Sequence, residues 1–294
     1  MHRLAVALAL AGACACHSVS PQPPVATPAA PTAQTAPARP ARHTHENLNG
    51  VLWMQTGAEY RATALQAYRA ARVQLDAALN DKTWTAAVEQ TGDPSSLPPA
   101  VVLDLDETVI DNSAYAARGM IDGSAYTPAG WAAWVEERRA RAIPGAVEFL
   151  KYARSKGVTP FYVTNRDHKV EQATRDNLAR LEIPVESSRD TVLTRYESGW
   201  TASDKGARRQ AVAADYRILL LVGDNFEDFL GGTLTTVENR FTLTDKYAGY
   251  WGAKWIILPN PTYGSWESAI TSGQGQLTDA QSLGAKYKAL GTER

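Results

Sequence analysis

Two aspartates directly follow a short apolar run, and this arrangement limits the folds and sites open to the chain. The run 101–103 (VVL) is typical of a buried strand, and Asp104 and Asp106 come at its end. Because side chains alternate between the faces of a strand, these two positions share a face. Ligands of open parallel α/β sheets bind beyond the carboxyl ends of the strands. The pair therefore predicts a functional site at that edge of a sheet.

Two neighbouring carboxylates also need a compensating positive charge. They repel each other unless a cation or a shared proton lies between them. Mg²⁺ prefers carboxylate oxygens and the phosphate oxygens of substrates as ligands. Asp104 and Asp106 therefore suit a magnesium site that also binds phosphate.

Apolar runs alternate with helical segments along the rest of the chain. Strands are expected at 161–163, 218–222 and 255–258, with a helix between the first two that extends to about residue 180. An earlier amphipathic helix is indicated by apolar residues at spacings of three and four, namely Tyr60, Ala64, Tyr68, Ala71, Leu75 and Leu79. Such alternation predicts an α/β fold, a doubly wound and mostly parallel sheet with helices on both faces.

Net charge excludes some classes of partner. The 294 residues include 30 Lys and Arg against 31 Asp and Glu, so no overall field favours a nucleic-acid polymer or an anionic membrane surface.

The hydrophobic share of 44% is ample for a packed core. At about 100–200 residues per domain, the length fits one large or two modest domains.

The N-terminus has the features of an export signal. A basic start precedes the apolar run 4–11, which is shorter than the roughly 20 residues that a membrane span needs. Small residues then lead to Cys14, which resembles the lipid-modified cysteine of bacterial lipoproteins. Ala11 stands where such signals usually have Leu, and Cys16 is a competing lipidation site. Plain secretion is the alternative to a lipid anchor.

Three regions follow from this N-terminus. Residues 1–14 are the expected lipoprotein signal, residues 15–45 a disordered Pro/Ala/Thr tether, and residues 46–294 the folded domain. Ala15 replaces the aspartate that is associated with retention in the inner membrane. We therefore expect an exported protein whose lipid anchor lies in a bacterial outer membrane and faces the periplasm or the cell surface.

Further polar residues come after later apolar runs, in an order that suggests phosphate chemistry. Thr164 and Asn165 can donate hydrogen bonds to phosphate oxygens without adding negative charge. Lys205 is a point cation that suits phosphate. Asp224 ends a strand as a third acid, and Asp228 follows within one helical turn. Each signal is common by itself, but their order on successive strand ends is not explained by chance.

These residues resemble the four motifs of the haloacid-dehalogenase (HAD) superfamily. More narrowly, the chain is similar to the class C acid phosphatases, which are bacterial surface lipoproteins with 5′-nucleotidase activity. The segments that carry the resemblance are 104–112 (DLDETVIDN), 162–166 (YVTNR), 222–225 (VGDN) with 228–229 (DF), 131–134 (WAAW), 143–149 (IPGAVEF) and 258–266 (LPNPTYGSW). The departures are the atypical lipoprotein signal and the neighbours of Lys205, which vary in such enzymes.

The resemblance implies a mechanism for phosphomonoester hydrolysis. Asp104 would attack phosphorus and form an aspartyl-phosphate, while Asp106 would act as general acid and then as general base. Mg²⁺ would be held by Asp104, by the backbone carbonyl of Asp106 and by Asp224. Asp228 would orient the groups around the metal rather than bind it directly.

It also implies the substrate and its contacts. Thr164, Asn165 and Lys205 would bind the phosphoryl oxygens, while Trp131 and Tyr263 would stack on a flat leaving group. The expected substrates are small phosphomonoesters, above all nucleoside 5′-monophosphates, and relatives of this type often form homodimers. A HAD-like core would carry a small helical subdomain, built from residues 46–97, 112–144 and part of the C-terminus.

Two alternatives lie within the same superfamily, and a third belongs to another class of function. A carbon–halogen hydrolase would need neither the general acid Asp106 nor Mg²⁺. A phosphonatase would need an amine base that the sequence does not reveal. A surface lipoprotein that only binds ligands on a HAD fold would be expected to lose its nucleophile or metal acids, whereas Asp104, Asp106, Lys205 and Asp224 are all present.

Overall fold

The computed structural model describes residues 45–292, and a five-stranded sheet forms their centre. The strand order is β5-β4-β1-β6-β7, and every neighbouring pair is parallel. The strands are β1 (Pro99–Leu103), β4 (Thr159–Asp167), β5 (Val192–Arg195), β6 (Arg217–Gly223) and β7 (Trp255–Ile257). The predicted parallel sheet is therefore confirmed. The predicted signal with Cys14, and the predicted tether up to residue 44, lie outside the described residues.

The central strands are apolar because both of their faces are covered. All of β6 is buried, and β1 is buried from its second residue onward. Such strands have continuous hydrophobic runs rather than alternating ones. Leu103, the last residue of β1, pairs with Tyr162 on one side and Val222 on the other. This register brings the residues that follow all three strands to one edge of the sheet.

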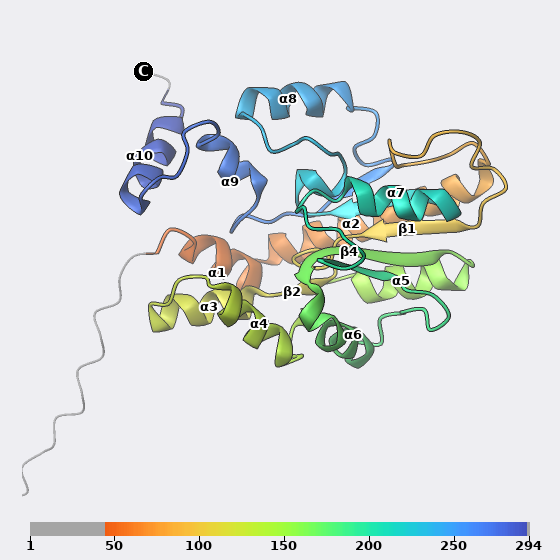
Figure 1. The fold of residues 1–294 in the computed structure, drawn as a ribbon, viewed down its shortest axis with the longest axis horizontal. Helices are drawn as coiled ribbons and strands as arrows, with labels where there is room; N and C mark the ends of the chain where they lie inside the picture. The colour runs from red at the N-terminus through yellow and green to blue at the C-terminus, as the bar shows by residue number, and fades with distance from the viewer. Residues whose placement is uncertain (1–44, 293–294) are drawn as a thin grey trace, which may run out of the picture. The chain divides into compact units, whose positions relative to one another are not determined.

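Helices cover both faces of the sheet, as the sequence predicted (Figure 1). On one face, α2 (Ala58–Asn80), α5 (Ala146–Ser155) and α6 (Glu171–Arg180) share a core with Leu103 and Val222. On the other face, α7 (Gly206–Asp215) packs over residues of β1, β4 and β6. The described helices thus complete a doubly wound α/β architecture.

The predicted amphipathic helix is α2, which extends from residue 58 to residue 80. Tyr60, Tyr68 and Leu75 are buried along its apolar stripe, while Leu79 is only half-buried. The helix contacts α5, β6 and β7, so it forms part of the layer that covers the sheet. This segment of the expected helical subdomain therefore belongs structurally to the core.

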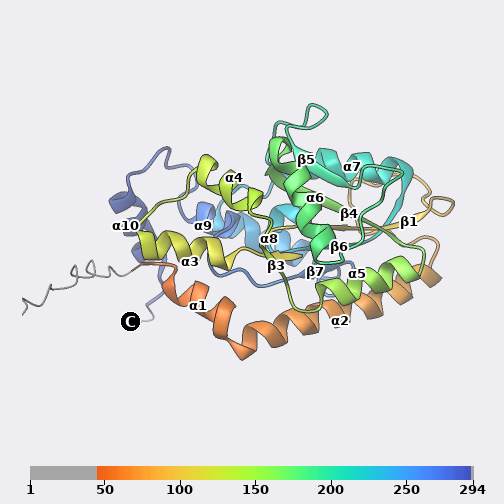
Figure 2. The ribbon, with the colours of Figure 1, turned by 90° about the horizontal axis from the view of Figure 1, so that it is seen from below.

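Other helices lie beyond the carboxyl edge of the sheet (Figure 2). They include α1 (Leu48–Thr56), α3 (Ser113–Asp122) and α4 (Pro128–Glu136), and α1 contacts α3. A small antiparallel pair, β2 (Ile110–Asp111) with β3 (Arg141–Ala142), connects this group to the core.

The chain continues after β6 through three more helices, which are α8 (Val237–Lys246), α9 (Ser265–Ile270) and α10 (Asp279–Ala289). Two short 3₁₀ turns, η1 (His168–Val170) and η2 (Phe226–Asp228), follow the ends of β4 and β6. Over residues 45–292, none of the helices combines the length and apolar character needed to span a bilayer.

Candidate active site

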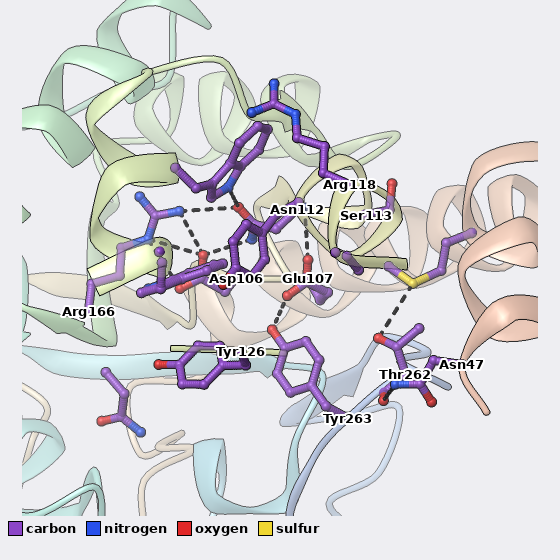
Figure 3. A pocket seen from close by; sticks show the side chains of 18 of the residues that line it. Asn47, Asp106, Glu107, Asn112, Ser113, Arg118, Tyr126, Arg166, Thr262 and Tyr263 are labelled. Atoms are coloured by element: carbon purple, nitrogen blue, oxygen red, sulfur yellow. Dashed lines mark hydrogen bonds and ion pairs between the residues drawn. The ribbon is translucent and has the colours of Figure 1, made fainter. Parts of the chain in front are cut away.

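A cavity of about 740 Å³ opens at the carboxyl ends of β1, β4 and β6. Its floor comes from the strand ends, and residues of α3 and α4 form another wall (Figure 3). It brings together eight of the predicted residues, namely Asp104, Asp106, Trp131, Asn165, Lys205, Asp224, Asp228 and Tyr263. The shared edge of three parallel strands therefore produces the site that the sequence predicted there.

Three carboxylates meet at the floor of this cavity. Asp104, Asp224 and Asp228 can each offer an oxygen within 4.8 Å of the others. Burial raises the pKa of Asp104 well above its usual range, and the neighbouring carboxylates raise it further against the opposing effect of Lys205. Burial and the charge of Asp228 raise the pKa of Asp224 to about 7. A hard divalent cation would neutralise this excess negative charge, so the donor set fits Mg²⁺.

Two of these acids, Asp224 and Asp228, are held by neighbouring groups. Asp224 accepts hydrogen bonds from Thr108 Oγ1 and Asn260 Nδ2, each at 2.9 Å. Asp228 Oδ2 accepts from the backbone N–H of Asn225 at 2.9 Å. The backbone approaches closely at Gly223, where an added Cβ would clash with the Asp228 carboxylate. Glycine at this position therefore lets Asp228 fold back over the strand end.

Lys205 lies between two of the acids. Its Nζ donates to Asp104 and, at 2.6 Å, to Asp228 Oδ1. Burial disfavours the charged form of the lysine, but the two carboxylates outweigh this effect and raise its pKa. The ammonium is therefore charged at neutral pH and lies where it can attract an anion into the cavity.

Asp106 is held on the side that faces α4. Arg166 Nη2 donates to Asp106 Oδ1 at 2.7 Å, and Asn112 Nδ2 donates to the same oxygen at 2.8 Å. Asn112 is fixed in turn, because its Oδ1 accepts from Trp134 Nε1 at 2.9 Å. Sequence reasoning assigned no role to Arg166 or Asn112, although both lie in the segments 104–112 and 162–166 that carry the resemblance.

The structure places the two predicted phosphate-binding residues of β4, Thr164 and Asn165, in different environments. Asn165 is exposed and lines the cavity. Thr164 is fully buried and is not part of the cavity wall, and its Oγ1 accepts from Arg166 N at 3.2 Å. The reason is that β4 continues as a strand to Asp167, beyond the expected end at residue 163, and successive side chains of a strand point to opposite faces, so that Thr164 is buried and Asn165 is exposed. Of the two, the structure brings only Asn165 to the cavity.

Aromatic side chains form the upper part of the cavity. Trp131 packs edge-on against Tyr115 at 5.2 Å between ring centroids, and the Arg166 guanidinium lies 5.6 Å from the Trp131 ring. Tyr263 is 46% exposed. Tyr126, which is 66% exposed, lies beside Tyr263 in Figure 3 and was not identified from the sequence. No motif marks Tyr126, because it lies in the loop between α3 and α4.

Glu107 connects the turn that follows β1 to the aromatic residues of the cavity wall. It is 1% exposed, and its Oε1 accepts from Asn112 N at 2.8 Å while its Oε2 accepts from the Tyr263 hydroxyl. Burial and the charge of Asp106 raise its pKa to about 8. Its φ of 61° is in the left-handed region, which costs about 1–2 kcal/mol for a residue with a side chain. Glu107 therefore holds Tyr263 in place through a turn that sequence reasoning did not detect.

Comparisons with known proteins agree with this geometry. A family model described as HAD superfamily, subfamily IIIB (acid phosphatase), matches residues 3–266. A solved structure of the class C acid phosphatase from Bacillus anthracis is 34% identical, with a TM-score of 0.73 over 84% of this chain and 97% of the other. The structure of the same enzyme with tungstate bound gives 33% identity and a TM-score of 0.72 over the same shares.

Proposed function

The chain belongs to subfamily IIIB of the HAD superfamily, the acid phosphatases, and is a phosphomonoester hydrolase; we propose that its substrates are nucleoside 5′-monophosphates and its metal Mg²⁺. The observation that carries this proposal is the composition of one cavity. Asp104, Asp224 and Lys205 lie at its floor, and the rings of Tyr126 and Tyr263 lie in its wall. Such a cavity suits a phosphate attached to a flat group.

Hydrolysis proceeds in two steps at the carboxyl end of β1. A carboxylate oxygen of Asp104 attacks phosphorus, the ester P–O bond breaks, and the leaving oxygen takes a proton from Asp106. Water then attacks the aspartyl-phosphate and gives a proton back to Asp106, which frees Asp104 and inorganic phosphate. Arg166 and Asn112 keep the Asp106 carboxyl group at the cavity throughout.

Phosphate and metal would both be held around Asp104. Asn165 and Lys205 line the cavity and would donate to phosphoryl oxygens. Asp104, Asp224 and the backbone carbonyl of Asp106 would hold Mg²⁺, which would supply positive charge against the repulsion between nucleophile and phosphate dianion. Asp228 orients these groups, since it binds both Lys205 and the backbone after β6.

A substrate panel tests this proposal. We expect nucleoside 5′-monophosphates to have lower KM values than sugar phosphates, because only nucleotides present a base to the aromatic wall. The KM should differ little among the four bases, since stacking on an aromatic ring is sequence-tolerant. Steady-state kinetics with purified enzyme provide the measurement. A sugar phosphate preferred over every nucleotide would contradict the proposed substrate class.

Tyr126→Ala is expected to weaken nucleotide binding selectively. Stacking on an aromatic side chain contributes about 1–3 kcal/mol per base, so the KM for a nucleotide should rise by about fivefold or more. The KM for ribose 5-phosphate should stay within about twofold, because this substrate has no base. Trp131→Ala and Tyr263→Ala are expected to act in the same direction, since all three residues line the cavity.

Tyr287→Ala is the matched control for this prediction, because Tyr287 is equally exposed at 69% but does not line the cavity. The KM values of this variant for both substrates should equal those of wild type. Equal losses on nucleotide and ribose 5-phosphate in Tyr126→Ala would show that the tyrosine acts on the phosphate site instead.

The proposed location follows from the N-terminal sequence. We propose that the enzyme is exported and anchored by a lipid on Cys14, with residues 15–45 as the spacer between membrane and catalytic domain. A near-neutral chain has no strong electrostatic attraction to anionic lipid headgroups, so the anchor would supply the membrane attachment.

A further inference from the structure

One arginine of α7 connects two loops of the active site without lining the cavity. Arg208 is 0% exposed. Its Nη1 donates to the carbonyl of Thr164, and its Nη2 donates to Asn165 Oδ1 at 2.6 Å and to the carbonyl of Ser203 at 3.2 Å. Thr164 and Asn165 lie near the carboxyl end of β4, and Ser203 lies two residues before Lys205. A single guanidinium therefore contacts both segments that carry the proposed phosphate donors.

We propose that Arg208 is a positioning residue that turns the Asn165 amide toward the phosphate and fixes the loop before Lys205. This inference rests on the proposed function, in which Asn165 and Lys205 bind the phosphoryl oxygens. It assigns a function to a side chain that touches neither substrate nor metal.

The chemistry of the two side chains determines the orientation of the amide. Arginine has only hydrogen-bond donors, whereas asparagine has an oxygen acceptor and an NH₂ donor. The Asn165 oxygen must therefore face Arg208, which leaves Nδ2 on the other side. Across residues 45–292, Nδ2 has no hydrogen-bond partner, and Asn165 is exposed at the cavity wall. A reversed amide would present its oxygen to the phosphate, and two acceptors would repel each other.

The same guanidinium holds the loop that leads into α7. Arg208 Nη2 also lies 3.4 Å from the carbonyl of Asp204. The Asp204 carboxylate accepts from Gly206 N at 2.7 Å and from Gly232 N at 3.2 Å, which closes the turn around Lys205. Through its contacts with the carbonyls of Ser203 and Asp204, Arg208 therefore helps to fix the loop that positions the Lys205 ammonium.

Arg208 also brings an unpaired positive charge close to the phosphate site. In the described part of the chain it makes no salt bridge, and all its acceptors are uncharged oxygens. Burial lowers its pKa to about 10, so the guanidinium stays charged at neutral pH. Burying an unpaired charge is unfavourable for folding. The position of this charge beside Asn165 is therefore favourable for an anionic substrate.

The chain offers a matched control in Arg217. This arginine is 3% exposed and, within the described residues, also donates only to uncharged oxygens, the backbone carbonyls of Ala78 at 3.1 Å and Asp81 at 2.5 Å. Burial lowers its pKa as well. It begins β6, whereas Asp224 follows the other end of that strand, and it does not line the cavity. Arg217 therefore has the same burial and bonding without the proposed role.

The experiment compares full-length Arg208→Met and Arg217→Met with wild type. Tungstate binding by calorimetry in the presence of Mg²⁺, steady-state kinetics and thermal melting are measured for each. Both variants are expected to melt at lower temperature, since each loses several hydrogen bonds. Only Arg208→Met should bind tungstate about tenfold or more weakly and lose kcat/KM in proportion, because a charge-assisted network is lost at the anion site. Equal tungstate affinities in the two variants would overturn the inference.

A double-mutant cycle tests the route through Asn165. If Arg208 acts through the amide, Arg208→Met should weaken tungstate binding less in an Asn165→Ala background than in wild type. An undiminished effect would overturn the orienting role. Arg208→Lys keeps a hydrogen-bond donor and the positive charge, so it is expected to bind tungstate more tightly than Arg208→Met does. If Arg208→Met does not fold, Arg208→Lys takes its place in the comparison. Wild-type enzyme that neither binds tungstate nor hydrolyses nucleotides would instead contradict the proposed function itself.

Discussion

Asp104→Asn is expected to lower kcat by about 10⁵-fold or more, because the amide cannot attack phosphorus and no other group replaces it. The variant should still fold. Lys205 keeps its bond to Asp228 at 2.6 Å, and removal of one buried carboxylate relieves repulsion within the acidic trio. Steady-state kinetics on a nucleotide and a thermal melt are the two measurements. Asp104→Asn that retains a few per cent of wild-type activity would exclude the proposed nucleophile.

Asp93→Asn is a suitable control, since Asp93 is exposed in the loop before β1 and does not line the cavity. Its activity should equal that of wild type. A second measurement identifies the intermediate directly, because acid quenching during turnover should trap phosphate on the peptide that contains Asp104. Phosphate trapped on any other peptide would assign the nucleophile to that segment.

Removal of divalent cations is expected to suppress hydrolysis by about 10³-fold or more, and Mg²⁺ should restore it. Without a cation, the charged forms of Asp104 and Asp224 are disfavoured, since burial and mutual repulsion raise the pKa of both. The nucleophile then faces a phosphate dianion with Lys205 as the main compensating charge. Rates measured after EDTA treatment and after addition of Mg²⁺ test this prediction. An EDTA-treated enzyme that works at its full rate would exclude a metal-dependent mechanism.

Thermal melting gives a readout of the metal that does not depend on turnover. A cation that binds the folded enzyme alone stabilises it, by about 2.7 kcal/mol at one hundred times its Kd. Wild type should therefore melt at higher temperature in Mg²⁺. Asp224→Asn should show a much smaller shift, because one of the expected metal ligands is lost. The same shift in both proteins would mean that the cation binds elsewhere.

The sheet and the floor of the site could be predicted because short-range patterns determine them. Buried parallel strands require continuous apolar runs, and β1 and β6 have them. The acids that follow those runs then meet at the same edge, so Asp104 and Asp224 could be placed together from the sequence alone. The amphipathic period of α2 likewise predicted its buried stripe, although it could not show that the stripe faces the sheet.

The walls of the site depend on long-range packing that no local pattern records. Tyr126 lies in the loop between α3 and α4 and reaches the cavity only because these helices lie at the edge of the sheet. Glu107 depends on a left-handed backbone that its residue type does not favour. Arg208 belongs to a charged stretch that normally indicates a solvated helix face, yet it is fully buried. Thr164 differs from expectation because β4 is longer than its apolar run.

The strand order has a consequence for how enzymes of this kind can diversify. The proposed nucleophile Asp104 follows the central strand β1, Asn165 lies near the carboxyl end of the neighbouring β4, and Asp224 follows β6 on the other side. The surface that meets the leaving group comes largely from residues 113–137, which belong to none of these strands. Selection can therefore remodel that helical stretch to accept new esters while the reaction itself is inherited unchanged.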